Sequence, residues 1–299
     1  MKKAATVIVI VLISVMMLVM FFSKEKSSIA KKPQVTVSTF ALYDVSKKLL
    51  HNIADVSMLI PFGQDIHTYE MTPQERIRIE QSTLFIYSGA GLEPWMTAFQ
   101  SHPNAIDMSQ FVLLREVEDY HGVSVDPHYW LNISNMISMT QKLRELFKET
   151  FAKELSQQIT TNAVHYIKML QSLDDLYKRR LAACHRDTIV VAHNAYGYLA
   201  DRYGFHVMTL SGFSPDVVPS AKDLARLSDL VHEKGVSTLF SEPYSSDRLI
   251  KSVAAEAHAR VDTLQPLANI TQREALEMRD YQLMMQLNLK KLYNALECQ

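Results

Sequence analysis

The stretch LSQQITTNAVHYIKMLQSLDDLYKRRLAAC, residues 155–184, decides the fold that we predict for this chain. It ends a longer run, from Asn135 to about Ala183, that contains no glycine and no proline. Apolar residues recur there at intervals of three and four, the spacing of one helix face. The run therefore predicts two helices, the second long. A helix of ~25 residues is about 40 Å long, so we expect a rigid strut between two lobes rather than a packed internal helix.

Strand and helix patterns alternate on both sides of this run. Before it, strands are predicted at 35–40, 56–60 and 84–87, with helical spacing at 42–53 and a helix start at Thr72-Pro73. After it, strands are predicted at 188–192, 207–210, 237–241 and 261–264, before a helical region at 271–296.

This alternation implies parallel sheets with crossover helices. We therefore predict an α/β fold of two lobes, each a mainly parallel sheet flanked by helices, joined by one long rigid helix. The expected boundaries are 34–154 for the first lobe, 155–184 for the connecting helix and 185–299 for the second lobe.

The N-terminus has the form of an export signal. Lys2 and Lys3 precede an apolar run, residues 4–22, that only Thr6 and Ser14 interrupt. We expect residues 1–30 to be a signal peptide and the protein to be periplasmic or otherwise extracytoplasmic. The run is also long enough for a retained membrane anchor. No cysteine follows it, which argues against a lipid-anchored form.

Charge and cysteine content narrow the possibilities further. The formal net charge of -1 argues against a nucleic-acid partner, which usually requires a basic face. The two cysteines, Cys184 and Cys298, lack the paired spacing of a structural zinc site. An exported protein could join them, and the sequence leaves that open.

Three of the 11 histidines directly follow strand-end or turn signals: His67, His128 and His193. Ligands of open α/β sheets bind beyond the carboxyl ends of the strands, so three imidazoles could converge there. Neutral imidazole suits zinc and other late transition metals. The wide intervals alone do not distinguish such a site from ordinary loop histidines.

The segments around these histidines resemble the metal-ion substrate-binding proteins of bacterial ABC importers, specifically the zinc-uptake type. The similar blocks occur in order along the chain: GQDIHTYEMTP at 63–73, GAGLEPW at 89–95, DPHYWL at 126–131, HNAYGY at 193–198, SGFSP at 211–215 and SEP at 241–243. The resemblance implies a monomeric binding protein, not an enzyme. It would hold Zn²⁺ between its lobes through His67, His128 and His193 and deliver it to a membrane permease.

The third ligand separates zinc from manganese within this resemblance. Manganese-binding members tend to have a carboxylate where this chain has His193, and nitrogen ligands favour zinc. The fourth ligand stays open, because Gln265 stands where the family often has an acid. Water, Gln265, Asp65, Glu242 and His121 are the candidates. Glu242 either supports a ligand histidine or caps a helix that starts at Ser245.

Three other functions compete with zinc capture. A manganese or iron substrate-binding protein would share the fold. A zinc-dependent hydrolytic enzyme would also use three histidines and a water, but no motif here supplies a general base. Surface adhesion is the third alternative.

Overall fold

A four-stranded parallel sheet forms the core of the first lobe. The computed structural model describes residues 32–99, 102–119, 122–210, 220–243 and 247–299. Its strands are β1 (Gln34–Val37), β2 (Asp55–Met58), β3 (Leu84–Tyr87) and β4 (Ala105–Asp107), in the order β2-β1-β3-β4. Helices α2 (Phe40–Leu49) and α3 (Pro73–Gln81) are its crossovers. The predicted start of α3 is confirmed, because Thr72 and Glu75 form a capping box.

The second lobe repeats this plan. Its strands are β7 (Thr188–Val191), β8 (His206–Thr209), β9 (Thr238–Ser241) and β10 (Arg260–Thr263), all parallel, in the order β8-β7-β9-β10. Its helices are α6 (Gly197–Tyr203), α7 (Ala221–Glu233) and α8 (Arg248–Glu256). Counted within each lobe, both sheets therefore have the strand order 2-1-3-4. The predicted α/β fold of two mainly parallel sheets is confirmed.

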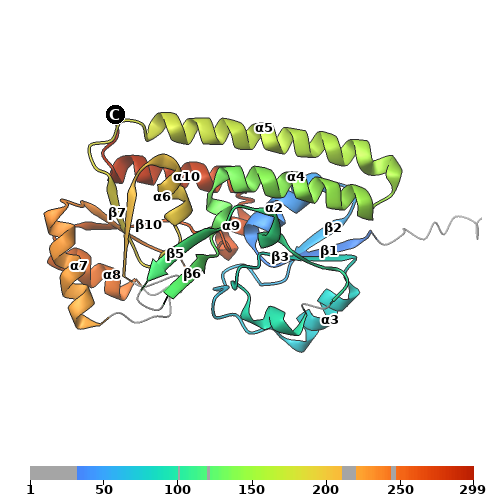
Figure 1. Ribbon diagram of the computed structural model, residues 1–299, viewed down its shortest axis with the longest axis horizontal. Helices are drawn as coiled ribbons and strands as arrows, with labels where there is room; N and C mark the ends of the chain where they lie inside the picture. Colours follow the sequence, from blue (N-terminus) through green and yellow to red (C-terminus); the bar gives the residue numbers. More distant parts are fainter. Residues whose placement is uncertain (1–31, 100–101, 120–121, 211–219, 244–246) are drawn as a thin grey trace, which may run out of the picture. The chain divides into compact units, whose positions relative to one another are not determined.

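The glycine-free run forms two helices, α4 (Ile133–Thr150) and α5 (Ser156–Arg180), and α5 extends along both lobes (Figure 1). Its first half is fixed to the first lobe, where the Tyr166 hydroxyl donates to Asp44 on α2 at 2.8 Å. Its second half is fixed to the second lobe, where Arg202 on α6 donates twice to Asp174, at 2.7 and 2.6 Å.

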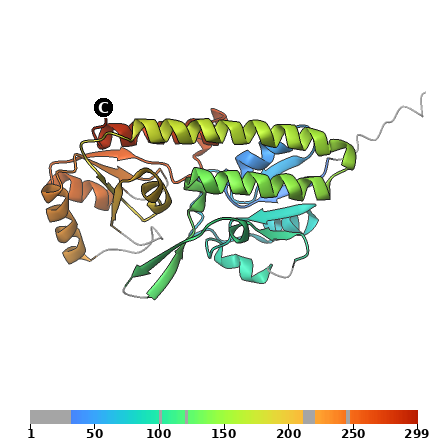
Figure 2. The same cartoon turned by 45° about the horizontal axis from the view of Figure 1, so that its top comes forward.

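The long helix joins the lobes as predicted, but it is also packed. One face is buried against α4, α2 and the C-terminal helix α10 (Tyr281–Ala295), as a second view shows (Figure 2). We expected this helix to connect the lobes rather than to pack inside the protein. That expectation was wrong in part, because α5 connects the lobes and also packs along one face.

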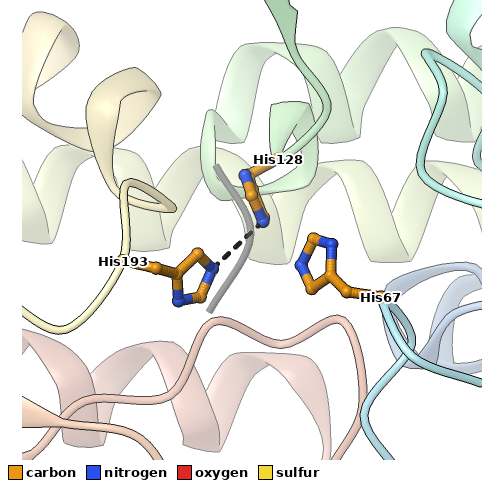
Figure 3. Close-up of side chains that lie close together, drawn as sticks. All are labelled: His67, His128 and His193. Carbon is orange, nitrogen blue, oxygen red and sulfur yellow. Dashed lines mark hydrogen bonds between the residues drawn. The ribbon is translucent and has the colours of Figure 1, made fainter. Parts of the chain in front are cut away.

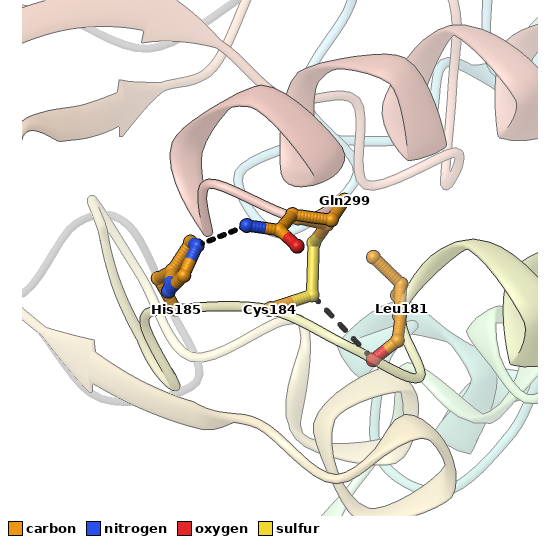
Figure 4. The surroundings of a disulfide bond; sticks show 5 residues. Leu181, Cys184, His185 and Gln299 are labelled. Carbon is orange, nitrogen blue, oxygen red and sulfur yellow. Dashed lines mark hydrogen bonds between the residues drawn. A yellow bond between two sulfur atoms is a disulfide. The ribbon is translucent and has the colours of Figure 1, made fainter.

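The chain returns to α5 at its end. After the short helix α9 (Gln272–Leu276), α10 packs along α5, and the Tyr177 hydroxyl donates to the Met285 carbonyl at 2.6 Å. Cys298 then forms a disulfide with Cys184, next to His185 and Gln299 (Figure 4). The pairing that the sequence left open is thus present.

Several elements had no sequence prediction of their own. They are β4, α6, α7 and the antiparallel hairpin of β5 (Arg115–Asp119) and β6 (Gly122–Asp126). A helix was expected to start at Ser245, and α8 starts at Arg248 instead. Single 3₁₀ turns add Pro94–Ala98, Met108–Phe111, Tyr129–Leu131 and Lys153–Leu155. Residues 1–30, the block at 211–215, His121 and Ser245 lie outside the described residues. Within the described part, no helix is both long and apolar enough to cross a membrane.

Candidate metal centre

His67 lies in the loop that follows β2, and this loop is held by side chains around it. Asp65 accepts a hydrogen bond from the His67 backbone N–H at 2.9 Å. The Asn269 side-chain amide donates to the carbonyls of Pro61 and Gln64, at 2.8 and 2.9 Å. These bonds fix the path of the loop, so the half-buried ring of His67 has a defined position.

His128 follows directly after strand β6, which ends at Asp126. One carboxylate oxygen of Asp126 accepts from the His128 backbone N–H at 3.0 Å and from its ring Nδ1 at 2.9 Å. Both side chains are completely buried. An ionised carboxylate can only accept, so in the ionised state of Asp126 the hydrogen sits on Nδ1, and Nε2 keeps its lone pair for another partner.

His193 follows strand β7, and a carboxylate lies against its ring. Glu242, after strand β9, places its Oε1 against the Nδ1 of His193, and both residues are buried. The alternative role for Glu242, capping a helix from Ser245, does not fit, since α8 begins at Arg248 after Asp247.

The three histidines converge between the two lobes (Figure 3). Nε2 of His128 lies 3.4 Å from Nε2 of His193, and ligand atoms from all three rings lie within 4.8 Å of one another. Two nitrogens bound tetrahedrally to one zinc, at about 2.0–2.1 Å each, would be about 3.3 Å apart. The cavity between the rings is about 10 Å³, the room of a single water or ion.

Burial prepares this site for a cation. It holds the pKa of His128 well below the usual value, and the neighbouring His193 and His67 act in the same direction. The ring is therefore neutral, as a metal ligand must be. Burial also raises the pKa of Asp126 to about 7. A cation among the three rings would compensate the buried carboxylates behind them.

Comparison with known families agrees with this geometry. The profile of the family described as "Zinc-uptake complex component A periplasmic" matches residues 35–295. The chain belongs to this family. The resemblance stated for its motifs is thus confirmed, as is the fold.

Members of the zinc-uptake component A family are similar to the chain over most of its length. The zinc-binding protein AdcA of Streptococcus pyogenes serotype M6 is 26% identical over 286 residues, which cover 87% of this chain and 55% of AdcA. The high-affinity zinc uptake system protein ZnuA of Bacillus subtilis is 27% identical over 288 residues, covering 89% and 88%. The chain thus spans about half the length of the AdcA relatives and most of the ZnuA relative.

Solved structures of family members show the same fold. The Zn(II)-bound ZnuA-like domain of Streptococcus pneumoniae AdcA superposes with a TM-score of 0.76 at 27% identity, covering 89% of this chain and 99% of that one. A crystal structure of ZnuA has a TM-score of 0.78 at 24% identity, covering 89% and 99%.

The candidates for a fourth ligand lie in different places. Asp65 and Glu242 line the cavity, although each already contacts a histidine. The side-chain amide of Gln265 donates instead to Glu274 at 2.7 Å, and Gln265 is not among the described residues that line the cavity. His121 lies outside the described residues.

Asp126 is the residue of this site that the sequence analysis did not single out. It was part of the DPHYWL block, and its spacing of two from His128 was a usable signal. An aspartate two residues before a ligand can accept from that residue's backbone N–H, and here the same oxygen also reaches the ring.

Proposed function

We propose that this chain captures Zn²⁺ outside the cytoplasm and delivers it to the membrane permease of an ABC importer. The observation that carries the proposal is the convergence of three histidine side chains from both lobes on a cavity for one ion. Two of the three rings have a buried carboxylate at Nδ1, which directs Nε2 to the centre. Relatives named for zinc binding and zinc uptake support the same reading.

The donor set favours zinc over manganese or iron. Three imidazole nitrogens form a softer set than the carboxylate-rich sites that suit manganese. Three histidines with one further position for water are an ordinary zinc environment. We propose His67, His128 and His193 as the ligands, with the fourth position taken by water.

The size of the cavity favours capture over hydrolysis. A hydrolytic zinc enzyme needs space for a substrate beside the metal-bound water and a base within reach of it. A cavity of about 10 Å³ gives no such space. The two carboxylates at its wall, Asp65 and Glu242, already contact histidines. A site with room for one ion suits a carrier that binds a single ion and releases it again.

We propose the remaining organisation from the sequence. Residues 1–30 would direct export, residues 34–154 and 185–299 would each supply part of the site, and residues 155–184 would connect them. The carrier would act as a monomer.

A metal-content measurement tests the proposal. The purified chain should hold about one zinc ion, as a single three-histidine centre requires, and His67→Ala, His128→Ala and His193→Ala should each lose it. His165→Ala is the matched control, because His165 is exposed on α5. Manganese that displaces zinc at a comparable concentration would contradict the choice of metal. Zinc retained by all three site variants would contradict the site.

A further inference from the structure

An arginine connects the buried carboxylate behind His128 to the opposite lobe. Arg115 opens strand β5, beside Asp126 at the end of β6. Its Nη1 lies 3.7 Å from Oδ2 of Asp126, the oxygen that does not contact His128. Its Nε donates to Asp201 on helix α6, in the second lobe, at 2.6 Å. The Arg115 guanidinium therefore joins carboxylates on both sides of the site.

The backbone beside Arg115 is tied to the same helix. The Arg115 backbone N–H donates to the Tyr198 hydroxyl at 2.6 Å, and that hydroxyl donates to the Asp126 carbonyl at 2.9 Å. Gly197, the first residue of α6, faces the guanidinium so closely that a Cβ there would lie 2.6 Å from Nη1 of Arg115. The base of the hairpin and the start of α6 thus fit together around this one side chain.

The arrangement has a consequence for the proposed zinc site, on which this inference rests. A completely buried carboxylate such as Asp126 needs a compensating charge to keep its orientation. Asp126 in turn fixes the ring of His128. Among the described residues, the Arg115 guanidinium is the one cation within ion-pair distance of Oδ2 of Asp126. Without it, this oxygen would have no compensating charge.

We propose that Arg115 is a positioning residue for zinc: it holds Asp126, and through it His128, and couples that ligand to the second lobe through Asp201. Helix α6 begins shortly after the loop that carries His193. The coupling therefore links the supports of two ligands that come from different lobes. Its main effect is to slow the separation of the lobes once the ion is bound.

Zinc-release kinetics of the full chain test this proposal. Removing an outer partner of a ligand typically costs 10–100-fold in metal affinity. We expect Arg115→Ala to raise the zinc dissociation rate, followed by chelator competition, about tenfold, while the association rate stays within about threefold. Arg115→Lys should recover most of the loss, because it restores the charge. Asp201→Asn should raise the dissociation rate in the same direction by a smaller factor.

Two further variants separate positioning from general destabilisation. Gly197→Ala leaves every charge in place, but its Cβ would meet the guanidinium at 2.6 Å and Oδ2 of Asp126 at 3.1 Å, so it should disturb this ion pair and speed release in part. Arg144→Ala is the control: Arg144 is exposed to 29%, as Arg115 is to 27%, and pairs with Glu145 at 2.7 Å on α4. It should release zinc at the wild-type rate. The visible spectrum of the Co²⁺-loaded chain should change for Arg115→Ala and not for Arg144→Ala.

The outcomes distinguish this proposal from the function on which it rests. A wild-type chain that holds no stoichiometric zinc would overturn the proposed function. A wild-type chain that holds zinc, with Arg115→Ala matching its dissociation rate and Co²⁺ spectrum, would overturn the role of Arg115 alone. Asp201→Asn with wild-type release would remove the coupling between the lobes.

Discussion

At the scale of single residues, the site depends on the hydrogen bond from His128 to Asp126. Asp126→Asn keeps the size of the side chain but removes the negative charge that the buried Nδ1–H faces. We expect zinc affinity to fall about 10–100-fold, measured by competition with a chelating dye. Asp107→Asn is the matched control, since Asp107 accepts from the N–H of Ser109 two residues on, at 2.9 Å, away from the histidines. Equal losses in both variants would contradict a specific role for Asp126.

Single residues also show where sequence reasoning stops. The three histidines could be found because each lies in a recognisable block after a strand-end or turn signal; the strand before His128 was not itself predicted. Asp126 lay inside one of these blocks, but its role depends on a rotamer that places one oxygen on both the backbone and the ring. The side chain of Gln265 donates to Glu274 on helix α9. The sequence predicted one helical region at 271–296 and did not separate α9 within it.

Gln265 gives a second prediction at this scale. Gln265→Glu would place a buried carboxylate at 2.7 Å from Glu274, where the amide now donates. We expect the free energy of unfolding to fall by about 2 kcal/mol at neutral pH, with partial recovery in acid as one carboxyl is protonated. Zinc affinity should not rise. Denaturant unfolding at two pH values measures this, with the neutral Gln265→Met as comparison.

The opposite result would reassign the fourth ligand. If Gln265→Glu leaves the unfolding free energy unchanged and tightens zinc binding tenfold, the side chain at position 265 contacts the ion instead of Glu274.

At the scale of elements, the longest helices and the buried strands were predictable, while a three-residue strand and the separate hairpin were not. A run without glycine or proline identified α4 and α5 because tens of residues carry the pattern. Strand β4 has only three residues, and the hairpin's two strands pair with each other rather than with a main sheet. The apolar face of α5 was visible in the spacing, but its packing partners were missed, because residues such as Asp44 and Arg202 lie on other elements.

The contact between α5 and α2 predicts a pH effect. Burial raises the pKa of Asp44 from 3.8 to about 6, although the Tyr166 hydroxyl and Lys48 lower it. The folded state therefore binds more protons than the unfolded state between these values, and stability falls as the pH rises through them. Above about pH 6 the ionised, buried carboxyl of Asp44 lowers the free energy of unfolding by the full amount, about 3 kcal/mol for two pKa units.

Asp44→Asn should remove this cost, because the amide cannot ionise and its oxygen can still accept from Tyr166. We expect the variant to be more stable than the wild type at pH 7, by up to about 3 kcal/mol, and the difference to vanish near pH 4. Thermal unfolding of the metal-free chain across this range measures it. A difference that does not change with pH would show that Asp44 ionises without a cost from burial.

At the scale of the whole described unit, the site results from two lobes with the same strand order. His67 and His193 each follow a strand of a different sheet, so neither lobe alone brings the three rings together. Helix α5 is anchored to α2 by Tyr166 and to α6 by Asp174. The same helix is therefore attached by side-chain hydrogen bonds to both lobes that supply the ligands.

The disulfide acts at this scale, because Cys184 and Cys298 are 114 residues apart and enclose the whole second lobe. Closing a loop of that length stabilises the folded state by about 5 kcal/mol, through the lower entropy of the unfolded chain. The double variant Cys184→Ser/Cys298→Ser should lose about that much unfolding free energy, measured in denaturant without metal. Its zinc affinity should stay within about twofold, since the disulfide lies at the end of α10 and not among the cavity residues. A large loss of zinc affinity with little loss of stability would instead assign the disulfide to holding the lobes in register.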